Sequence, residues 1–338
     1  MRVDVRTRIT RASLRVAAAA AAAVALSLAG CGDDVDDRPP GGPLAEALGA
    51  VGGGGAHGSL GVGWAEPRLV EKTDAGPELI AAALGPNAGT VIEAAPVLDR
   101  RFGFDPLSAE RLLSVGGSYA FGLRLDGVDG ARLRRALIHA GGRARRAGGL
   151  ELVDIGEYAV VPDPLLRADV NGLGARDAFG RDATVLAISD TSRASLIGRG
   201  DRLLDEPIYR AAADCLGEVV AARMIPDRLL LSTDLGVDLV ALGVHASGEE
   251  ILCVLGGTAE RADEIATALD ASLAPDAREP RGGGPIGKSV TGVDVAATGP
   301  YDGVEVVRAA LTPARGESPG FLFGTVARGS LVEMITGG

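Results

Sequence analysis

Aromatic side chains are scarce in this sequence and make up 3% of its 338 residues. The bases of single-stranded nucleic acid are commonly bound by stacking on aromatic rings. The composition therefore argues against a stacking platform for bases, and equally for sugars. The single tryptophan, Trp64, lies in an alternating apolar segment and is predicted to belong to the core. Any pocket for a small molecule is expected to be aliphatic.

Histidine and cysteine are also rare, with three of each. No two of the histidines have a metal-ligand spacing such as i, i+4; they are His57, His139 and His245. The chain has no G-x-S-x-G motif, and Ser118, Ser189 and Ser195 are interpreted as strand and turn residues. We therefore predict no catalytic residue, no metal and no cofactor, and do not expect an enzyme.

The N-terminus has the pattern of an export signal. Five arginines and one acid, Asp4, precede an apolar run from Val16 to Leu28. The run is shorter than the roughly twenty apolar residues of a membrane-spanning helix, but it suits a secretory signal. Leu28-Ala29-Gly30-Cys31 resembles the lipobox of bacterial lipoproteins, in which the cysteine is acylated and the preceding peptide is removed. We predict a signal peptide over residues 1–30 and lipidation of Cys31; the alternative is a plain secretory signal followed by a chance cysteine.

The mature chain is predicted to be strongly acidic. The signal carries five Arg and one Asp, a net charge of +4, so its removal changes the formal charge from −11 to −15. Nucleic acids bind to basic surfaces that displace counterions, so we expect no nucleic-acid partner. The abundance of Ala, Gly and Arg is typical of proteins from GC-rich, actinobacterial genomes.

Residues 31–58 are rich in Asp, Pro and Gly, which bury little apolar surface, and we predict a flexible tether there. Within it, Leu44–Val51 is expected to form at most one or two helical turns. The rest of the chain alternates between short strands and helices in a strand–strand–helix–strand–strand order. This order indicates an α+β fold with two modules of antiparallel sheet and packed helices, over residues 59–205 and 206–332.

Turn and capping signals place most elements. Strands are predicted at 60–64, 119–125, 150–161, 184–189, 239–245, 250–255, 290–297, 304–311 and 321–327. Helices are predicted at 77–84, 90–101, 131–140, 207–224 and 258–273. Asp129 and Thr258 are the expected N-caps of two of these helices.

Four segments together resemble a known family. They are Phe104-Asp105-Pro106 with Leu112–Gly117, then Tyr158–Val161, Val185–Ser189 and Leu204–Arg210. In this layout, spanning about residues 60–225, the chain is similar to a family of exported bacterial proteins of unknown function. The resemblance implies export and α+β modules, and it implies no catalytic residue.

Three motifs resemble functional sites but are better explained as structural features. Gly282-Gly-Gly-Pro-Ile-Gly287-Lys288-Ser289 matches the phosphate-loop formula, but a strand rather than a helix is predicted after it, so we interpret it as a connector. Asp126–Gly130 resembles part of a calcium loop but lacks its ligand pattern, and is interpreted as a turn with an N-cap. The basic cluster Arg143, Arg145 and Arg146 is interpreted as a solvated helix end, with weak contact to lipid headgroups as the alternative.

Cys215 and Cys253 are predicted to form a disulfide. They are the cysteines that remain once Cys31 is lipidated, and an exported chain matures where disulfides persist. Cys215 shares a helix face with Ala211, and Cys253 lies in an apolar strand, so helix-on-sheet packing would bring them together. The alternative is two separate buried thiols.

For function, the sequence leaves three hypotheses. The first is a membrane-anchored, non-catalytic lipoprotein that binds or scaffolds another envelope component, and a flat apolar surface patch would favour it. The second is a carrier of a lipid or small apolar ligand, and a cavity of several hundred Å³ lined by Leu, Val and Ile would favour it. The third is an envelope hydrolase, which would need a histidine clustered with a Ser and an Asp.

Overall fold

The computed structural model describes residues 42–53, 60–116, 121–139, 141–147, 149–154, 176–230 and 235–337. All of them belong to one compact unit, Pro39–Gly338. The predicted signal peptide and Cys31 lie outside these ranges, and so does His57.

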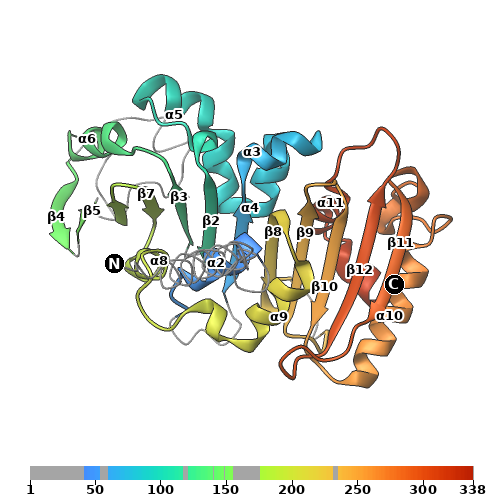
Figure 1. The fold of residues 1–338 in the computed structure, drawn as a ribbon. Coiled ribbons are helices and arrows are strands. Elements are labelled where there is room, and N and C mark those ends of the chain that lie inside the picture. The colour runs from blue at the N-terminus through green and yellow to red at the C-terminus, as the bar shows by residue number, and fades with distance from the viewer. Residues whose placement is uncertain are drawn as a thin grey trace, which may run out of the picture. The chain divides into compact units, whose positions relative to one another are not determined.

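The described strands form one twelve-stranded sheet in which all neighbours are antiparallel (Figure 1). Its order is β11-β12-β10-β9-β8-β1-β2-β3-β7-β6-β5-β4. The strands are β1 Gly61–Ala65, β2 Arg111–Gly116, β3 Phe121–Asp126, β4 Arg143–Ala147, β5 Leu150–Asp154, β6 Arg176–Phe179, β7 Ala183–Ala187, β8 Val219–Pro226, β9 Leu239–His245, β10 Glu250–Leu255, β11 Val290–Ala297 and β12 Val306–Pro313.

The two halves of the chain build the two halves of this sheet. Strands β1–β7 come from residues before 205 and strands β8–β12 from residues after 206, and the halves meet where β1 pairs with β8. In the first half β1 to β3 follow one another outward from the centre, helix α6 (Ala131–His139) comes next, and β4 to β7 return from the edge toward the centre. In the second half β8 to β10 lead outward, helix α10 (Ala259–Leu273) follows, and β11 and β12 return from the edge. The predicted α+β class with antiparallel sheet and packed helices is confirmed.

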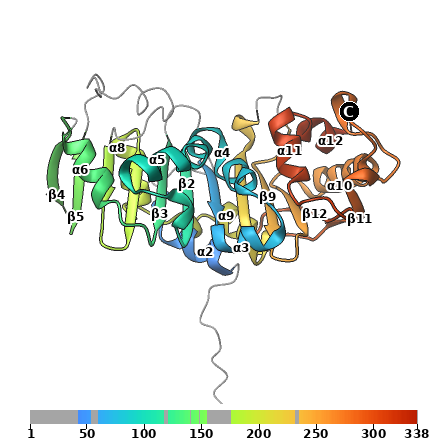
Figure 2. The ribbon, with the colours of Figure 1, turned by 90° about the horizontal axis from the view of Figure 1, so that it is seen from above.

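Helices cover both faces of the sheet (Figure 2). One face carries α3 Pro67–Val70, α4 Pro77–Glu93, α5 Ala95–Phe102, α6, α10, α11 Phe321–Arg328 and α12 Leu331–Thr336. The other carries α2 Gly42–Gly49, α8 Asp190–Leu196 and α9 Pro207–Leu216. Strand β10 shows the result: Leu252 and Val254 enter one core, while Ile251, Cys253 and Leu255 enter the other. A strand buried on both faces reads as a continuous apolar run.

The helix predicted over 207–224 is wrong in its second half. Helix α9 ends at Leu216, and Gly217 leaves the helical region with φ 67° and ψ −145°. The next residues form β8, the strand that pairs with both β1 and β9 at the centre of the sheet. Val219 and Val220 are β-branched and favour a strand. The predicted helix over 207–224 includes them because their apolar run continues that of the preceding helix.

The strand predicted over 321–327 is also wrong, because this segment forms helix α11. The Glu250 carboxylate on β10 accepts hydrogen bonds from the backbone N–H groups of Gly320, Phe321 and Leu322, at 2.8–2.9 Å. These are N–H groups that a helix start leaves without partners inside the helix. A side chain seventy residues away in sequence thus stabilises the start of the helix, and no local pattern reveals it.

The boundary of the predicted tether needs correction as well. Residues 42–53 lie within the interval 31–58, yet α2 packs onto the sheet and contacts α9. Leu44, Leu48 and Val51 are at most 1% exposed. Two apolar side chains on this short helix and a third just after it bury enough surface to hold the segment against the body. The folded part of the chain therefore begins earlier than residue 59.

The basic cluster is not a helix end. Arg143, Arg145 and Arg146 lie in β4, the outermost strand on its side of the sheet. Arg145 pairs with Asp154 and Arg146 with Glu151, both on the neighbouring β5. Charged side chains on an edge strand discourage pairing with another chain.

Candidate ligand-binding cavity

A cavity of about 590 Å³ opens on the face of the sheet that carries α4. Its floor comes from β1, β2 and β8, and its walls from α4 and the C-terminal helices α11 and α12. The apolar lining includes Leu84, Leu229, Leu230, Val326, Leu331 and Val332. The volume falls in the range of roughly 300–1,000 Å³ found for small-molecule sites. Phe121 is the aromatic residue among the described lining residues.

Glycines in β1 make the floor. Gly61 and Gly63 alternate with Val62 and Trp64, so both glycines face α4 while Trp64 is fully buried in the opposite core. A Cβ atom on Gly63 would lie 2.4 Å from the Ala83 carbonyl oxygen. The missing side chain therefore lets α4 approach the sheet closely. Trp64 belongs to the core, as its alternating position predicted.

A break in α4 lies directly over this floor. Gly85 has φ 85° and ψ 171°, a conformation that glycine adopts readily, and Pro86 follows it. Because Pro86 has no N–H, it cannot donate the helical i→i−4 hydrogen bond to the carbonyl of Ala82. Arg223 Nη1 donates to that carbonyl at 3.4 Å, and Ser114 Oγ donates to the Leu84 carbonyl at 2.8 Å.

The sheet register aligns these two polar side chains. Gly63 is the partner of Ser114 on β2 and of Arg223 on β8, so the three residues lie in one line across the sheet. Ser114 is buried and Arg223 is partly buried. Neither side chain was predicted to be functional, although a Gly-Pro pair inside a helical pattern and a lone arginine in an apolar strand are visible in the sequence.

The cavity carries an excess of positive charge among its described residues. Arg281 also lines it, but this arginine pairs with Glu333 at 2.8 Å and donates to the Arg328 carbonyl at 3.1 Å. Arg223 has no carboxylate partner among the described residues. Burial lowers the pKa of the Arg223 guanidinium below its ordinary value, but an arginine stays protonated at neutral pH.

The predicted disulfide is confirmed. Cys215 on α9 and Cys253 on β10 are bonded, with their Cα atoms 6.4 Å apart. Both residues are buried, at 4% and 0% exposure. The bond lies in the core on the side of the sheet opposite the cavity. It therefore joins a helix to the sheet and is remote from the lining residues.

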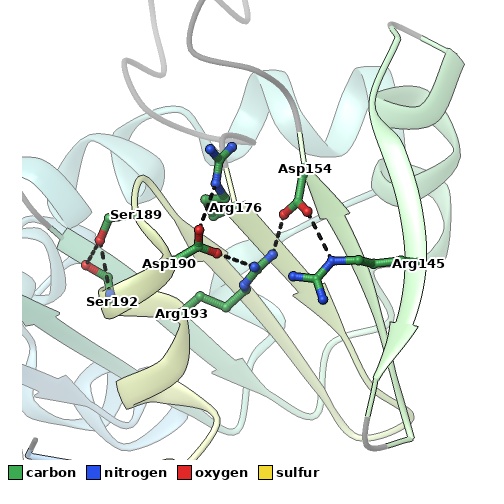
Figure 3. A network of polar contacts seen from close by, with 7 residues as sticks. All are labelled: Arg145, Asp154, Arg176, Ser189, Asp190, Ser192 and Arg193. Carbon is green, nitrogen blue, oxygen red and sulfur yellow. Dashed lines mark hydrogen bonds and ion pairs between the residues drawn. The ribbon is translucent and has the colours of Figure 1, made fainter.

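A second polar cluster lies at the other end of the sheet (Figure 3). Arg193 on α8 pairs with Asp154 and Asp190, and Arg145 and Arg176 pair with the same two carboxylates. Burial raises the pKa of the Asp154 carboxyl, but hydrogen bonds and charge from Arg193 and Arg145 outweigh it, so the pKa lies below the usual value. The cluster ties α8 to β4, β5 and β6, and we interpret it as structural.

The serines of this region have helix-capping and packing positions. Ser189 Oγ accepts from the Ser192 N–H at 3.1 Å as the N-cap of α8, and its hydroxyl lies 2.9 Å from that of Ser192 (Figure 3). Ser195 is buried in the same helix. Ser118 lies outside the described residues. None of the described serines contacts a histidine.

The described histidines, Lys288 and Asp129 all lie in structural positions. His139 ends α6, and His245 Nε2 lies 2.8 Å from the Leu216 carbonyl oxygen. No group of three or more metal-ligating side chains forms within the described residues. Lys288 lies in a short 3₁₀ turn followed by β11, the strand predicted there. Asp129 accepts from the Ala131 N–H at 2.8 Å in the predicted turn, but α6 begins at Ala131, so Gly130 and not Asp129 occupies the N-cap position.

No family model, curated protein or solved structure matches this chain. The resemblance of residues 60–225 to a family of exported proteins stays a prediction. The function is therefore argued from the cavity and its chemistry.

Proposed function

We propose that this protein is a non-catalytic, exported lipoprotein that carries a small ligand with an aliphatic chain. The observation behind the proposal is the cavity of about 590 Å³ between α4, the sheet and the C-terminal helices. A lining of Leu and Val side chains stabilises apolar ligand surface, at about 25 cal/mol for each Å² removed from water. The cavity contains no histidine among its described lining residues, which speaks against the hydrolase alternative.

A role as a scaffold for another envelope component has less support. Such a role favours a contiguous apolar patch on the surface. Among the described residues, Ile138 is the large apolar side chain that is exposed, at 37%. A single exposed side chain makes no docking surface, so we place the scaffold second to the carrier.

The anchor in this proposal is the lipid on Cys31. No helix among the described residues is long and apolar enough to cross a membrane. We expect the Cys31→Ser variant to be exported but to leave the membrane fraction, because it lacks the cysteine that carries the acyl chains needed for stable anchoring. Detergent-phase partitioning measures this. Partitioning of the variant equal to that of the wild type would contradict the anchor.

Mass spectrometry of lipids that co-purify with the protein from its native envelope tests the carrier. A Val332→Trp variant fills the cavity from α12 and should lose the co-purified ligand. Ile138→Trp introduces the same residue at an exposed site that does not line the cavity, and should keep the ligand. Equal ligand loads in both variants, or no ligand in the wild type, would contradict the proposal.

A further inference from the structure

Arg223 has donor capacity that the fold does not use. A guanidinium carries five N–H groups. One contact accounts for its structural role: Nη1 donates to the Ala82 carbonyl, to which Pro86 cannot donate, at 3.4 Å. That distance is beyond the usual 2.7–3.2 Å of an N–H···O bond. Within the fold, the charged and partly buried Arg223 side chain therefore makes one weak hydrogen bond.

The guanidinium of Arg223 also borders the cavity. A Cβ atom on Gly85 would lie 3.7 Å from Nε and Nη2 and 3.8 Å from Cζ, which are ordinary van der Waals distances, so Gly85 packs against the guanidinium. Arg223, Gly85 and Pro86 all line the cavity. The N–H groups of an arginine match the oxygens of a carboxylate in both geometry and charge. The first turn of the second half of α4 also lines the cavity there, and its dipole favours a negative charge.

The charge balance indicates a monoanion. Arg281 is matched by Glu333, which leaves Arg223 as the uncompensated charge among the described lining residues. The rest of the lining offers aliphatic surface from Leu229, Leu230 and Val332. A ligand complementary to both parts has one negative group and one hydrocarbon chain.

We propose that the cavity binds a fatty acid, whose carboxylate pairs with the guanidinium of Arg223 while its chain lies against α11 and α12. This inference rests on the proposed carrier function and names its ligand class. Arg223 is then a binding residue as well as the partner of the Ala82 carbonyl. A carboxylate there would also offset the cost of a partly buried, unpaired cation.

A matched pair of ligands tests the proposal by isothermal titration calorimetry at pH 7. Dodecanoic acid and 1-dodecanol share their chain and differ in charge, and both are used below their aggregation limits. We expect the wild type to bind the acid roughly ten- to hundred-fold more tightly than the alcohol, the range expected for a hydrogen bond to a charged group. Arg223→Gln should abolish this preference and keep alcohol binding, and Arg223→Lys should keep part of it.

A control variant separates the loss of an arginine elsewhere from the loss of the proposed contact. The double variant Arg210→Gln/Asp302→Asn removes an ion pair that does not line the cavity, without changing net charge, and should keep the preference for the acid. Retained alcohol binding by Arg223→Gln shows that the cavity is intact.

Each other outcome overturns a defined part of the reasoning. If neither ligand binds the wild type, the carrier function itself is wrong. If both bind equally, or if Arg223→Gln keeps the preference, the carrier stands and the fatty-acid assignment is wrong. Tighter binding of dodecyl phosphate than of dodecanoic acid would contradict the fatty-acid assignment and would indicate that the ligand's head group is a phosphate.

Discussion

Replacing both disulfide cysteines by alanine removes the covalent link between α9 and β10. The bond closes a loop with a sequence separation of 38. In the chain-entropy treatment, a loop of this length lowers the entropy of the unfolded chain enough to stabilise the fold by about 4 kcal/mol. Both side chains are at most 4% exposed, so losing two sulfur atoms also weakens packing between the helix and the sheet. We expect Cys215→Ala/Cys253→Ala to lose about 4 kcal/mol of unfolding free energy.

Chemical denaturation followed by far-UV circular dichroism measures this loss. Because the cross-link restricts the unfolded chain, the double variant should also expose more surface on unfolding and show a larger m-value. The reduced wild type is the matched control, since it lacks the bond but keeps both sulfur atoms. The difference between the reduced wild type and the variant then isolates the packing contribution.

Two results would contradict the expected stabilisation by the disulfide. One is a loss below about 1 kcal/mol in the reduced wild type, which would show that the loop does not constrain the unfolded chain as the entropy treatment requires. The other is alkylation of two thiols on the denatured, non-reduced protein, which would show that Cys215 and Cys253 are not bonded.

Three further substitutions follow from single positions. Gly85→Ala should lose roughly 1–3 kcal/mol, since alanine does not adopt its backbone conformation without strain, whereas Gly284→Ala, with open space around it, should stay within about 0.5 kcal/mol by thermal unfolding. Glu250→Ala should lose about 3 kcal/mol by leaving three buried or partly buried N–H groups unpaired, with Glu317→Ala, at an exposed position, as a near-neutral control. Burial raises the pKa of the Glu250 carboxyl, although the three N–H groups lower it, so the fold binds its proton more tightly than the unfolded chain does. Wild type should therefore gain stability over Glu250→Ala as the pH falls from neutrality toward the ordinary carboxyl value, and an opposite slope in pH-dependent unfolding would contradict the reasoning. Lys288→Ala should change stability by less than about 0.5 kcal/mol, and ATP should not raise the melting temperature of the wild type; an ATP-dependent rise that the variant loses would restore the phosphate loop.

Local patterns were sufficient where an element's neighbours in sequence decide its structure. The strands predicted at 239–245, 250–255 and 290–297 have the observed bounds of β9, β10 and β11. The Thr258 hydroxyl accepts from the Arg261 N–H at 3.2 Å, as its predicted capping position requires. In these cases capping chemistry, turn residues and apolar runs all favour the same structure.

Contacts between distant segments decided the rest. Residues 219–226 are apolar enough for either a helix or a strand, and pairing with β1 and β9 makes them the central strand β8. The same pairing aligns Arg223 with Gly63 and Ser114 beneath the break in α4.

The α+β class, most of the elements and the pairing of Cys215 with Cys253 could be predicted from the sequence. These follow from periodicity, composition and the small number of cysteines, which are properties of short segments or of simple counts. The helix at α11, the packing of residues 42–53 and the cavity could not, because they depend on contacts between distant segments. The cavity is bounded by residues from β1, β2, α4, β8, α11 and α12, and its shape depends on sheet register and on where a helix breaks. Those are long-range quantities, and no single segment of this chain encodes them.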